Sequence, residues 1–134
     1  MISKQYLITG LIMGFIGIAM SLLFRMQLAW PGESFPVFEA VLGKWAPEGV
    51  MDADIYLALV TIHGTIMVFF VLTAGLSGTF SNLLIPLQIG ARDVAFPRLN
   101  AFSYWTFLGG ALILKLSWIT GNAPNAGWFG YSPL

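Results

Sequence analysis

No aspartate, glutamate, lysine or arginine occurs between Asp54 and Arg92, and this uncharged interval limits what the chain can fold into. The interval is longer than the stretch of about 20 apolar residues that crosses the hydrocarbon core of a bilayer. The whole chain is 57% hydrophobic and 9% charged, with a mean hydropathy of +0.81, whereas soluble domains are roughly a quarter charged. The sequence therefore predicts an integral membrane protein.

Three apolar segments are predicted to form transmembrane helices, so the expected fold class is an all-α membrane protein. They cover approximately residues 6–24, 55–85 and 101–119. The second segment is longer than a straight crossing requires, so we expect it to tilt or to protrude from the lipid before Pro86 ends it. Gly10, Gly14 and Gly17 share one face of the first helix, which lets a neighbouring helix approach closely.

Positively charged residues near the predicted helix ends indicate the orientation of the chain. One side carries Lys4, Arg92 and Arg98, and the other side carries Arg25 and Lys44. Because cytoplasmic segments are enriched in positive residues, we place the N-terminus and the 86–101 connection inside. The first helix is then a retained signal anchor rather than a cleaved signal peptide. The acidic segment 30–54 is expected outside.

Net charge and cysteine content exclude some classes of function. The formal net charge is zero and there is no cysteine. A neutral chain exerts no broad electrostatic attraction on nucleic acid, so nucleic acid is not an expected partner. Disulfides, thiolate metal sites and thiol nucleophiles are excluded for a sequence without cysteine. The lipid bilayer is the expected surrounding.

The one histidine of the sequence, His63, lies inside the uncharged interval, in the stretch VTIHGTIMVFF. It falls about eight residues into the second predicted helix, roughly 12 Å from the outer end at 1.5 Å per residue. Gly64 follows it and leaves room for a flat group to press close. Position alone leaves two interpretations open. The histidine either forms a hydrogen bond to a neighbouring helix or is an axial ligand of a haem iron.

The inner connection carries Asp93, the one carboxylate in the second half of the sequence. Arg92 and Arg98 flank it, so a structural aspartate that caps a helix or forms a salt bridge is one interpretation. The other is a proton collector at the mouth of a hydrated path, because Asn82 and Asn100 lie near the adjoining helix ends. Neutral amides both donate and accept hydrogen bonds, so they orient water without trapping a proton.

Four longer motifs resemble those of a single family. PLQIGARDVAFPRLN, residues 86–100, is similar to the helix II–III loop of haem–copper oxidase subunit I. HGTIMVFF resembles the second-helix motif around the family's low-spin haem ligand. SLLFRMQLAWPG resembles the end of its first helix, and GWFGYSPL the segment after its third. The motifs occur in the family's order over nearly the whole sequence.

The resemblance implies that these residues form the N-terminal three-helix portion of a twelve-helix fold. His63 would then be an axial ligand of the low-spin haem, which we expect to be haem a. The residues expected against that haem are Arg25, which would bond a polar substituent, Tyr56, and Trp128 near the propionates. The residues expected at the entrance of a proton-uptake pathway are Asp93, Asn82 and Asn100.

The resemblance also implies what this portion lacks. The family's second low-spin ligand, the high-spin haem ligand, the histidine ligands of copper B and the cross-linked tyrosine lie downstream of the matching motifs. A sequence with one histidine cannot build the oxygen-reducing centre, so no catalytic residue is expected here. The chain is accordingly expected to be a fragment, or a split subunit whose remainder is another chain.

The activity implied is that of a cytochrome c oxidase, a proton-pumping oxidoreductase of the respiratory chain in the bacterial inner membrane. The implied partners are the remainder of subunit I, subunits II and III, and cytochrome c. Quinol oxidases share ARDVAFP, but some carry an arginine and an aspartate in helix one, and residues 6–24 contain neither. The loop around Asp93 argues against a nitric oxide reductase. A non-catalytic three-helix subunit, with His63 as a packing residue, is the alternative from another class.

The sequence departs from the family's pattern at three positions. Ala101 replaces the second of a commonly paired asparagine, which bears on the rim of the proton pathway. Gln27 stands where many members have a carboxylate near a small cation site, so that metal is not predicted. Lys115 is unusual in the third helix and lies about a turn before Trp118, so we expect its stem to snorkel toward the outer interface.

Overall fold

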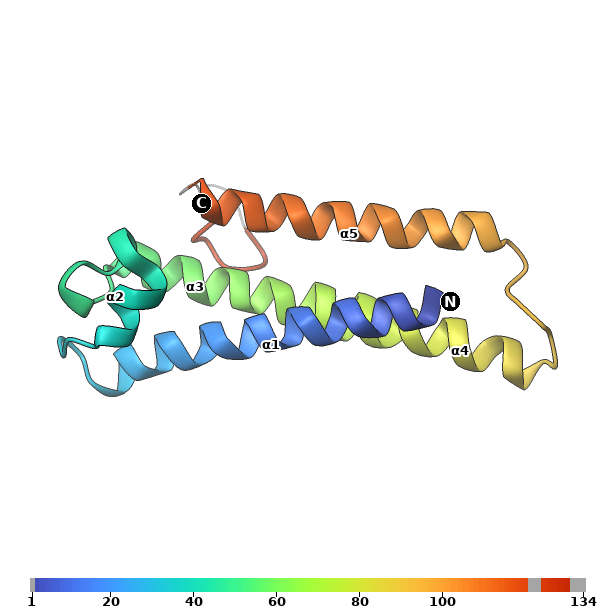
Figure 1. Ribbon diagram of the computed structural model, residues 1–134, viewed down its shortest axis with the longest axis horizontal. Coiled ribbons are helices and arrows are strands. Elements are labelled where there is room, and N and C mark those ends of the chain that lie inside the picture. Colours follow the sequence, from blue (N-terminus) through green and yellow to red (C-terminus); the bar gives the residue numbers. More distant parts are fainter. Residues whose placement is uncertain (1, 121–123, 131–134) are drawn as a thin grey trace. The chain divides into compact units, whose positions relative to one another are not determined.

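The structure is a computed structural model that describes residues 2–120 and 124–130, and every regular element in this part of the chain is a helix (Figure 1). The long elements are α1 (Ile2–Ala29), α3 (Ala53–Thr65), η3 (Ile66–Ser77), α4 (Gly78–Gln88) and α5 (Pro97–Ile119). The short ones are α2 (Pro36–Leu42), η1 (Gly43–Trp45) and η2 (Pro47–Gly49). The all-α class is confirmed for the described residues.

Contacts divide the chain into two compact units. The first unit combines Met1–Phe15 with Ile66–Asn122, and the second combines Ile16–Thr65 with Ala123–Leu134. The first therefore contains the start of α1 together with η3, α4 and α5. The second contains the rest of α1, the short helices, α3 and the described part of the C-terminal segment.

Each helix range expected from the sequence lies inside a longer helical segment. Elements α3, η3 and α4 follow one another without a break from Ala53 to Gln88. The expectation that Pro86 ends this helix is wrong by two residues, because Pro86 lies within the last turn of α4. Proline removes one backbone donor there, and the chain leaves the helix at Gly90, whose φ is +69°. Helix α5 begins earlier than expected, at Pro97, since a first helical residue needs no backbone N–H.

The middle of the continuous helix is wound more widely than an α-helix. Residues 66–77 form the π-helical element η3, and the hydroxyl of Thr73 donates to the carbonyl of Val68, five residues earlier, at 2.7 Å. Such windings are rare and are usually a single turn long. Side chains after Ile66 therefore do not follow the face that α-helical spacing predicts from His63.

Two of the described helices are long and apolar enough to cross a membrane by length and composition. They are α1 and the continuous helix Ala53–Gln88. Helix α5 is not one of them, although it has 23 residues. Its sequence includes Arg98, Asn100, Ser103 and Lys115, and these polar residues lower its hydropathy.

In the first unit, α1 packs on η3 and α4 through glycine. A Cβ atom on Gly10 would lie 3.0 Å from the Cα atom of Gly75, so at this point two backbones are in direct contact. One turn further along α1, Gly14 faces the side chain of Val71. Two of the three glycines expected on one face are thus at a helix contact in this unit. Small residues allow two helices to approach this closely in a membrane, where the hydrophobic effect does not drive helices together.

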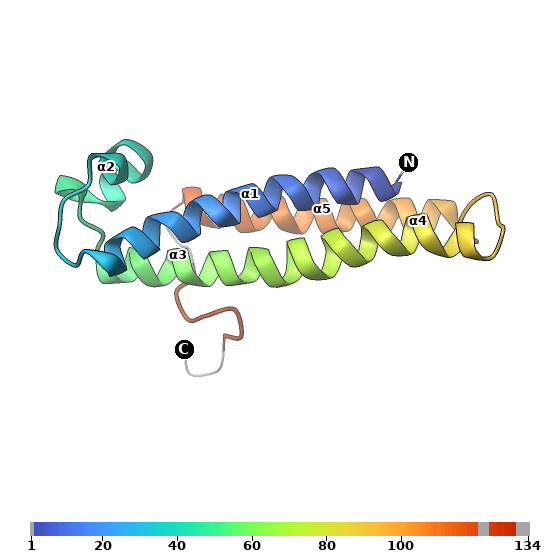
Figure 2. The ribbon, with the colours of Figure 1, turned by 90° about the horizontal axis from the view of Figure 1, so that it is seen from below.

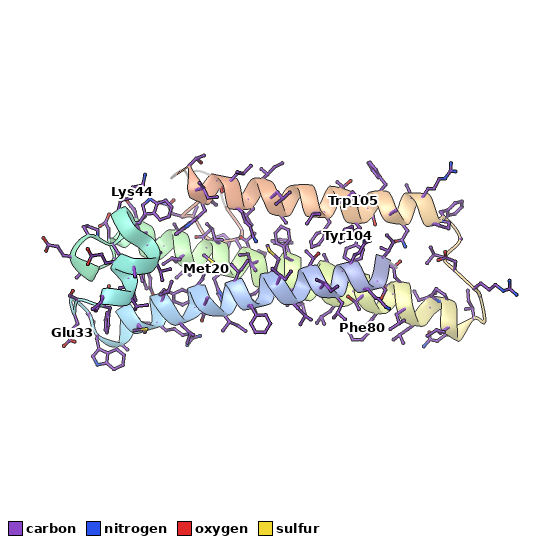
Figure 3. All side chains as sticks on the ribbon, viewed as in Figure 1. Met20, Glu33, Lys44, Phe80, Tyr104 and Trp105 are labelled. Atoms are coloured by element: carbon purple, nitrogen blue, oxygen red, sulfur yellow. The ribbon has the colours of Figure 1, made fainter. Side chains whose placement is uncertain are left out.

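Aromatic side chains fill the space between the start of α1 and α5 in the same unit. Tyr6 is 7% exposed and lies against the backbone of Gly78, where a Cβ atom would be 2.8 Å from its ring. Its ring centroid lies 5.2 Å from that of Tyr104 and 5.5 Å from that of Phe107. Figure 3 shows Tyr104 on the side of α5 that faces α1. These ring contacts bury Tyr6 and Tyr104.

In the second unit, the segment expected as an acidic loop contains α2 and two short 3₁₀ turns (Figure 2). Phe38 is fully buried, and the backbone N–H of Phe35 donates to the carbonyl of Gly49 at 2.9 Å. Gly49 has a φ of +75°, and a Cβ atom there would strike Ser34 and Phe35. The side-chain oxygen of Gln27 accepts from the backbone N–H of Met51 at 2.9 Å, which ties this segment to α1.

We predict that Gly10→Ala lowers the midpoint of thermal unfolding of the detergent-solubilised protein. The added methyl group would lie 3.0 Å from backbone that cannot yield locally, and overpacking of this kind costs about 1–3 kcal/mol. The control is Gly109→Ala on α5, where nothing lies within 4 Å of an added Cβ atom. That change should stabilise α5 slightly, since glycine is a poor helix former. Equal effects of the two changes on thermal unfolding followed by circular dichroism would contradict the prediction.

Candidate functional site

The side chain of His63 is held by the backbone of α1. Its Nδ1 atom lies 2.8 Å from the carbonyl oxygen of Gly17, the third glycine of the predicted face. A carbonyl oxygen can only accept, so Nδ1 carries the proton, and Nε2 of the neutral ring keeps its lone pair. Among residues 2–120 and 124–130, this is the one hydrogen bond of the His63 side chain. The histidine bonded to a neighbouring helix is therefore found, and its other nitrogen is left as a potential ligand.

Aromatic rings and small residues surround this imidazole. Phe24 is buried and meets the His63 ring edge to face, with centroids 5.4 Å apart. Tyr56 contacts the same Phe24 at 6.1 Å, so Phe24 connects two of the residues predicted at the haem. The backbone places Gly17 and Phe24 two turns apart on α1, a spacing that brings both to α3. The His63 ring thus contacts an apolar ring, that of Phe24, and a backbone carbonyl, that of Gly17.

The segment after α5 returns to α3 beside the histidine. The backbone N–H of Gly127 donates to the hydroxyl of Thr61 at 2.9 Å. Trp128 lies against Gly64, where a Cβ atom would be 3.5 Å from the indole Cδ1 atom. Gly64 thus leaves room for a flat group, as expected, and in this structure the group is the Trp128 side chain. The structure brings Trp128 to the residue next to His63, and Trp128 is 53% exposed.

Arg25 is placed on the same helix as Gly17 but is not in contact with His63. Its Nε atom donates to the hydroxyl of Ser21 at 3.0 Å, one turn earlier on α1, and its side chain is exposed. At 1.5 Å per residue it lies roughly 12 Å along the helix from Gly17. Among the described residues it forms no ion pair, so its charge is available to an acceptor from elsewhere.

These residues fit one side of a haem site. Neutral imidazole with its second nitrogen bonded to a backbone carbonyl is the usual form of a metal-binding histidine, because the bond fixes ring orientation and tautomer. The apolar and aromatic neighbours suit a macrocycle, and a guanidinium suits a polar substituent at its edge. No group of three or more metal-ligating side chains occurs in the described part of the chain. The site could therefore supply one axial bond to iron, and not a polydentate protein cage.

A second polar group lies in the first unit, at the junction of α4 and α5. The amide nitrogen of Asn100 donates to the side-chain oxygen of Asn82, and the Asn82 amide donates to the Gly78 carbonyl at 2.6 Å. Both side chains are half-buried. Both asparagines were predicted from the sequence as pathway residues. In the structure they are in direct contact, although they lie 18 residues apart in the chain.

The polar contacts continue from the asparagines to α1. The hydroxyl of Ser103 donates to the Asn100 carbonyl at 2.7 Å and lies 3.0 Å from the hydroxyl of Tyr6. One turn away, the hydroxyls of Thr9 and Tyr104 are 2.8 Å apart. Sequence analysis missed Tyr6, although a tyrosine inside an apolar helix needs a partner for its hydroxyl and gives a usable signal. The side chains of Asn82, Asn100, Ser103 and Tyr6, joined between Asn100 and Ser103 through the Asn100 backbone carbonyl, form a polar line between three helices.

Asp93 is not joined to this line by a hydrogen bond between described residues. It is exposed, and its Oδ1 atom accepts from the backbone N–H of Val94 at 2.8 Å. No ion pair with Arg92 or Arg98 is found in the described ranges 2–120 and 124–130. The salt bridge that one interpretation of Asp93 required is therefore absent from the described residues. The carboxylate is exposed, and one of its oxygens accepts a hydrogen bond from the next residue of the chain.

Comparison with known proteins identifies the family of the chain. The family model described as "Cytochrome C and Quinol oxidase polypeptide I" matches residues 1–134. Quinol oxidase subunit 1 of Bacillus subtilis is 43% identical over 130 residues, which are 97% of this chain and 18% of that protein. Cytochrome c oxidase subunit 1 of Alkalihalophilus pseudofirmus is 41% identical, over 99% of this chain and 19% of that protein.

A third relative differs in organisation. The heme-copper oxidase subunit I+III of Aeropyrum pernix is 42% identical over 99% of this chain, and the match covers 14% of that protein. The chain thus spans about a fifth or less of the length of these relatives. Since the family model covers every residue from 1 to 134, the chain belongs to the cytochrome c and quinol oxidase polypeptide I family.

Proposed function

We propose that this chain is the N-terminal part of subunit I of a proton-pumping terminal oxidase that transfers electrons from cytochrome c to oxygen and forms water. Family membership supports the oxidase activity of the complete subunit. The hydrogen bond between His63 Nδ1 and the Gly17 carbonyl supports haem binding by this part of the subunit. The high-spin haem and copper B belong to the complete subunit, because this sequence has one histidine. The chain alone is inactive in this proposal.

His63 holds the low-spin haem in this proposal, through the lone pair of Nε2. Arg25 donates to a polar substituent of that haem, while Tyr56 and Trp128 border it, with Trp128 near the propionates. The bound haem supplies one-electron transfer, and we expect haem a. The contribution of the chain is to fix the ring of His63 with the Gly17 carbonyl, to exclude water with Phe24, and to place a guanidinium at the edge.

Asp93 takes up protons from the inner side in this proposal, and Asn82 and Asn100 line the path beyond it. The exposure of Asp93 and the contact between the two asparagines support these roles. Ser103 and Tyr6 extend the line toward α1, since hydroxyls both donate and accept. Ala101 follows Asn100 where a second asparagine is common in the family, which leaves Asn100 as the asparagine of this turn.

The proposed setting is the inner membrane of a bacterial cell, with α1, the Ala53–Gln88 helix and α5 crossing the bilayer. The N-terminus and the connection that contains Asp93 lie in the cytoplasm, and the segment with α2 lies outside. Lys4, Arg92 and Arg98 on the inner side support this orientation. The partners are the remainder of subunit I, subunits II and III, cytochrome c and the lipid bilayer.

Quinol is the second candidate electron donor, and a specific observation supports it. The Bacillus subtilis relative at 43% identity is named a quinol oxidase, whereas the relative named a cytochrome c oxidase is 41% identical. Against this, residues 6–24 contain neither aspartate nor arginine, so this stretch of α1 offers no charged group for a quinone head. We retain cytochrome c as the proposed donor.

The donor can be tested with the purified complete oxidase. We predict that oxygen consumption is supported by reduced cytochrome c and not by a quinol, measured with an oxygen electrode at matched electron supply. The reason is the absence of charged side chains in residues 6–24. Rapid oxygen consumption with quinol alone would overturn the choice of donor and leave the oxidase assignment intact.

We predict that His63→Ala in the complete oxidase removes the low-spin haem, because the imidazole nitrogen has no substitute at this position. The low-spin band in the reduced-minus-oxidised spectrum should disappear while the assembled subunits remain together on a sizing column. The matched control is Thr65→Ala, in the last turn of α3, whose hydroxyl bonds the carbonyl of Thr61 at 2.9 Å. An unchanged low-spin band in the histidine variant would instead support the non-catalytic three-helix subunit.

We predict that Asp93→Asn slows turnover and proton uptake by about tenfold to a hundredfold, because an amide cannot release a proton to the path. Proton uptake is measured with a pH-sensitive dye in reconstituted vesicles. Asp52→Asn is a close control, since the Oδ1 atom of Asp52 accepts from the next backbone N–H at 2.8 Å, as that of Asp93 does. Similar losses in both variants would attribute the effect to the turn and not to proton uptake.

A further inference from the structure

Phe24 is a buried side chain of α1 that contacts two rings of α3 in the second unit. Its ring centroid lies 5.4 Å from that of His63 and 6.1 Å from that of Tyr56, with interplanar angles of 69° and 79°. Both contacts are edge to face, an arrangement that aromatic rings prefer to a face-to-face sandwich. His63 and Tyr56 lie about two helical turns apart on α3. Phe24 therefore packs against two rings on one side of that helix.

The hydrogen bond to Gly17 does not by itself fix the plane of the His63 ring. The bond holds the Nδ1 atom 2.8 Å from the carbonyl oxygen. The χ2 torsion of a histidine is soft, because its energy wells are broad and not sharply staggered. The ring can therefore tilt while this one hydrogen bond is kept. A second contact on the ring is needed to limit the tilt, and Phe24 supplies one.

Both of these contacts on the imidazole come from α1. Gly17 and Phe24 lie about two turns apart on this helix, so its backbone fixes the distance between the two holding points. Phe24 is 9% exposed, and its contact with Tyr56 limits the movement of its own ring. The imidazole is thus held at Nδ1 by a backbone group and at the ring by a side chain that is itself held in place.

We propose that Phe24 is a positioning residue, which sets the plane of the His63 imidazole and thereby the orientation in which Nε2 meets the haem iron. This inference rests on the proposed role of His63 as an axial ligand. The bound haem supplies one-electron transfer, and Phe24 acts on it only through His63. An aliphatic side chain of similar size would still exclude water from this position. It would not form the edge-to-face contact that limits the tilt of the ring.

The test is electron paramagnetic resonance of the oxidised complete oxidase, because the g-values of a low-spin ferric haem depend on the orientation of its axial imidazole planes. Phe24→Leu should keep the low-spin optical band but shift and broaden the low-spin ferric signal. Phe24→Tyr keeps the ring and should keep the parent signal. The matched control is Phe15→Leu on the same helix, where the side chain is 72% exposed. This control should leave the signal unchanged.

Four outcomes would overturn the proposal. The first is a parent signal in Phe24→Leu, and the second is an equal shift in Phe24→Leu and Phe15→Leu. The third is loss of the low-spin band from an assembled Phe24→Leu oxidase, which would make Phe24 necessary for haem retention and not for orientation. The fourth is failure of both Phe24→Leu and Phe24→Met to assemble, which would assign Phe24 a packing role only.

Failure of the proposed function is distinguished by a different variant. If His63→Ala keeps the low-spin band, His63 is not the ligand, and the role of Phe24 falls with that assignment. If His63→Ala loses the band and Phe24→Leu keeps the parent signal, the ligand assignment stands and only the role of Phe24 is wrong.

Discussion

Where Gly10 of α1 meets Gly75 of η3, two backbones touch with no side chain between them, and the other contacts of α1 in the first unit depend on that approach. Each unit shows its own consequence of the glycine face. In the first, Tyr6 reaches the backbone of Gly78 and Ser103 of α5. In the second, the carbonyl of Gly17 comes within hydrogen-bond distance of His63. A larger residue on this face would keep the hydrogen-bonding groups of the packed helices apart. In an apolar surrounding, no water would take the place of the lost partners.

The bond to Gly17 gives His63 a structural role, and the proposed role of His63 as a haem ligand does not compete with it. A backbone carbonyl accepts the proton of Nδ1, which satisfies one buried polar group and fixes the tautomer. The same bond leaves the lone pair on the opposite nitrogen and fixes the orientation of the ring. Because the partner is backbone, substitution of Gly17 by another small residue would keep the acceptor, whereas loss of the imidazole would remove both functions.

The sequence was sufficient for features that depend on local composition. Helical structure over the predicted ranges, the glycine face, and the positions of Asn82 and Asn100 near adjoining helix ends were predicted, because apolar runs and residue spacing are local properties. The partner of His63, the role of Tyr6 and the return of Trp128 to Gly64 were not predicted. Each joins segments far apart in the chain, and a single sequence carries no record of such pairings. All the predicted site roles stay predictions, namely those of His63, Arg25, Tyr56 and Trp128 at the haem and those of Asp93, Asn82 and Asn100 in the proton pathway.

The π-helical winding of residues 66–77 has a consequence for how this family can vary. A wide turn holds more residues than an α-helical turn over a similar rise, so it behaves as an α-helix that has absorbed an insertion. Removal of one residue from this stretch would be taken up by tighter winding, which leaves the later side chains close to their present direction about the helix axis. A single-residue deletion in residues 66–77 would therefore be tolerated better than one in the α-helical parts of the same helix.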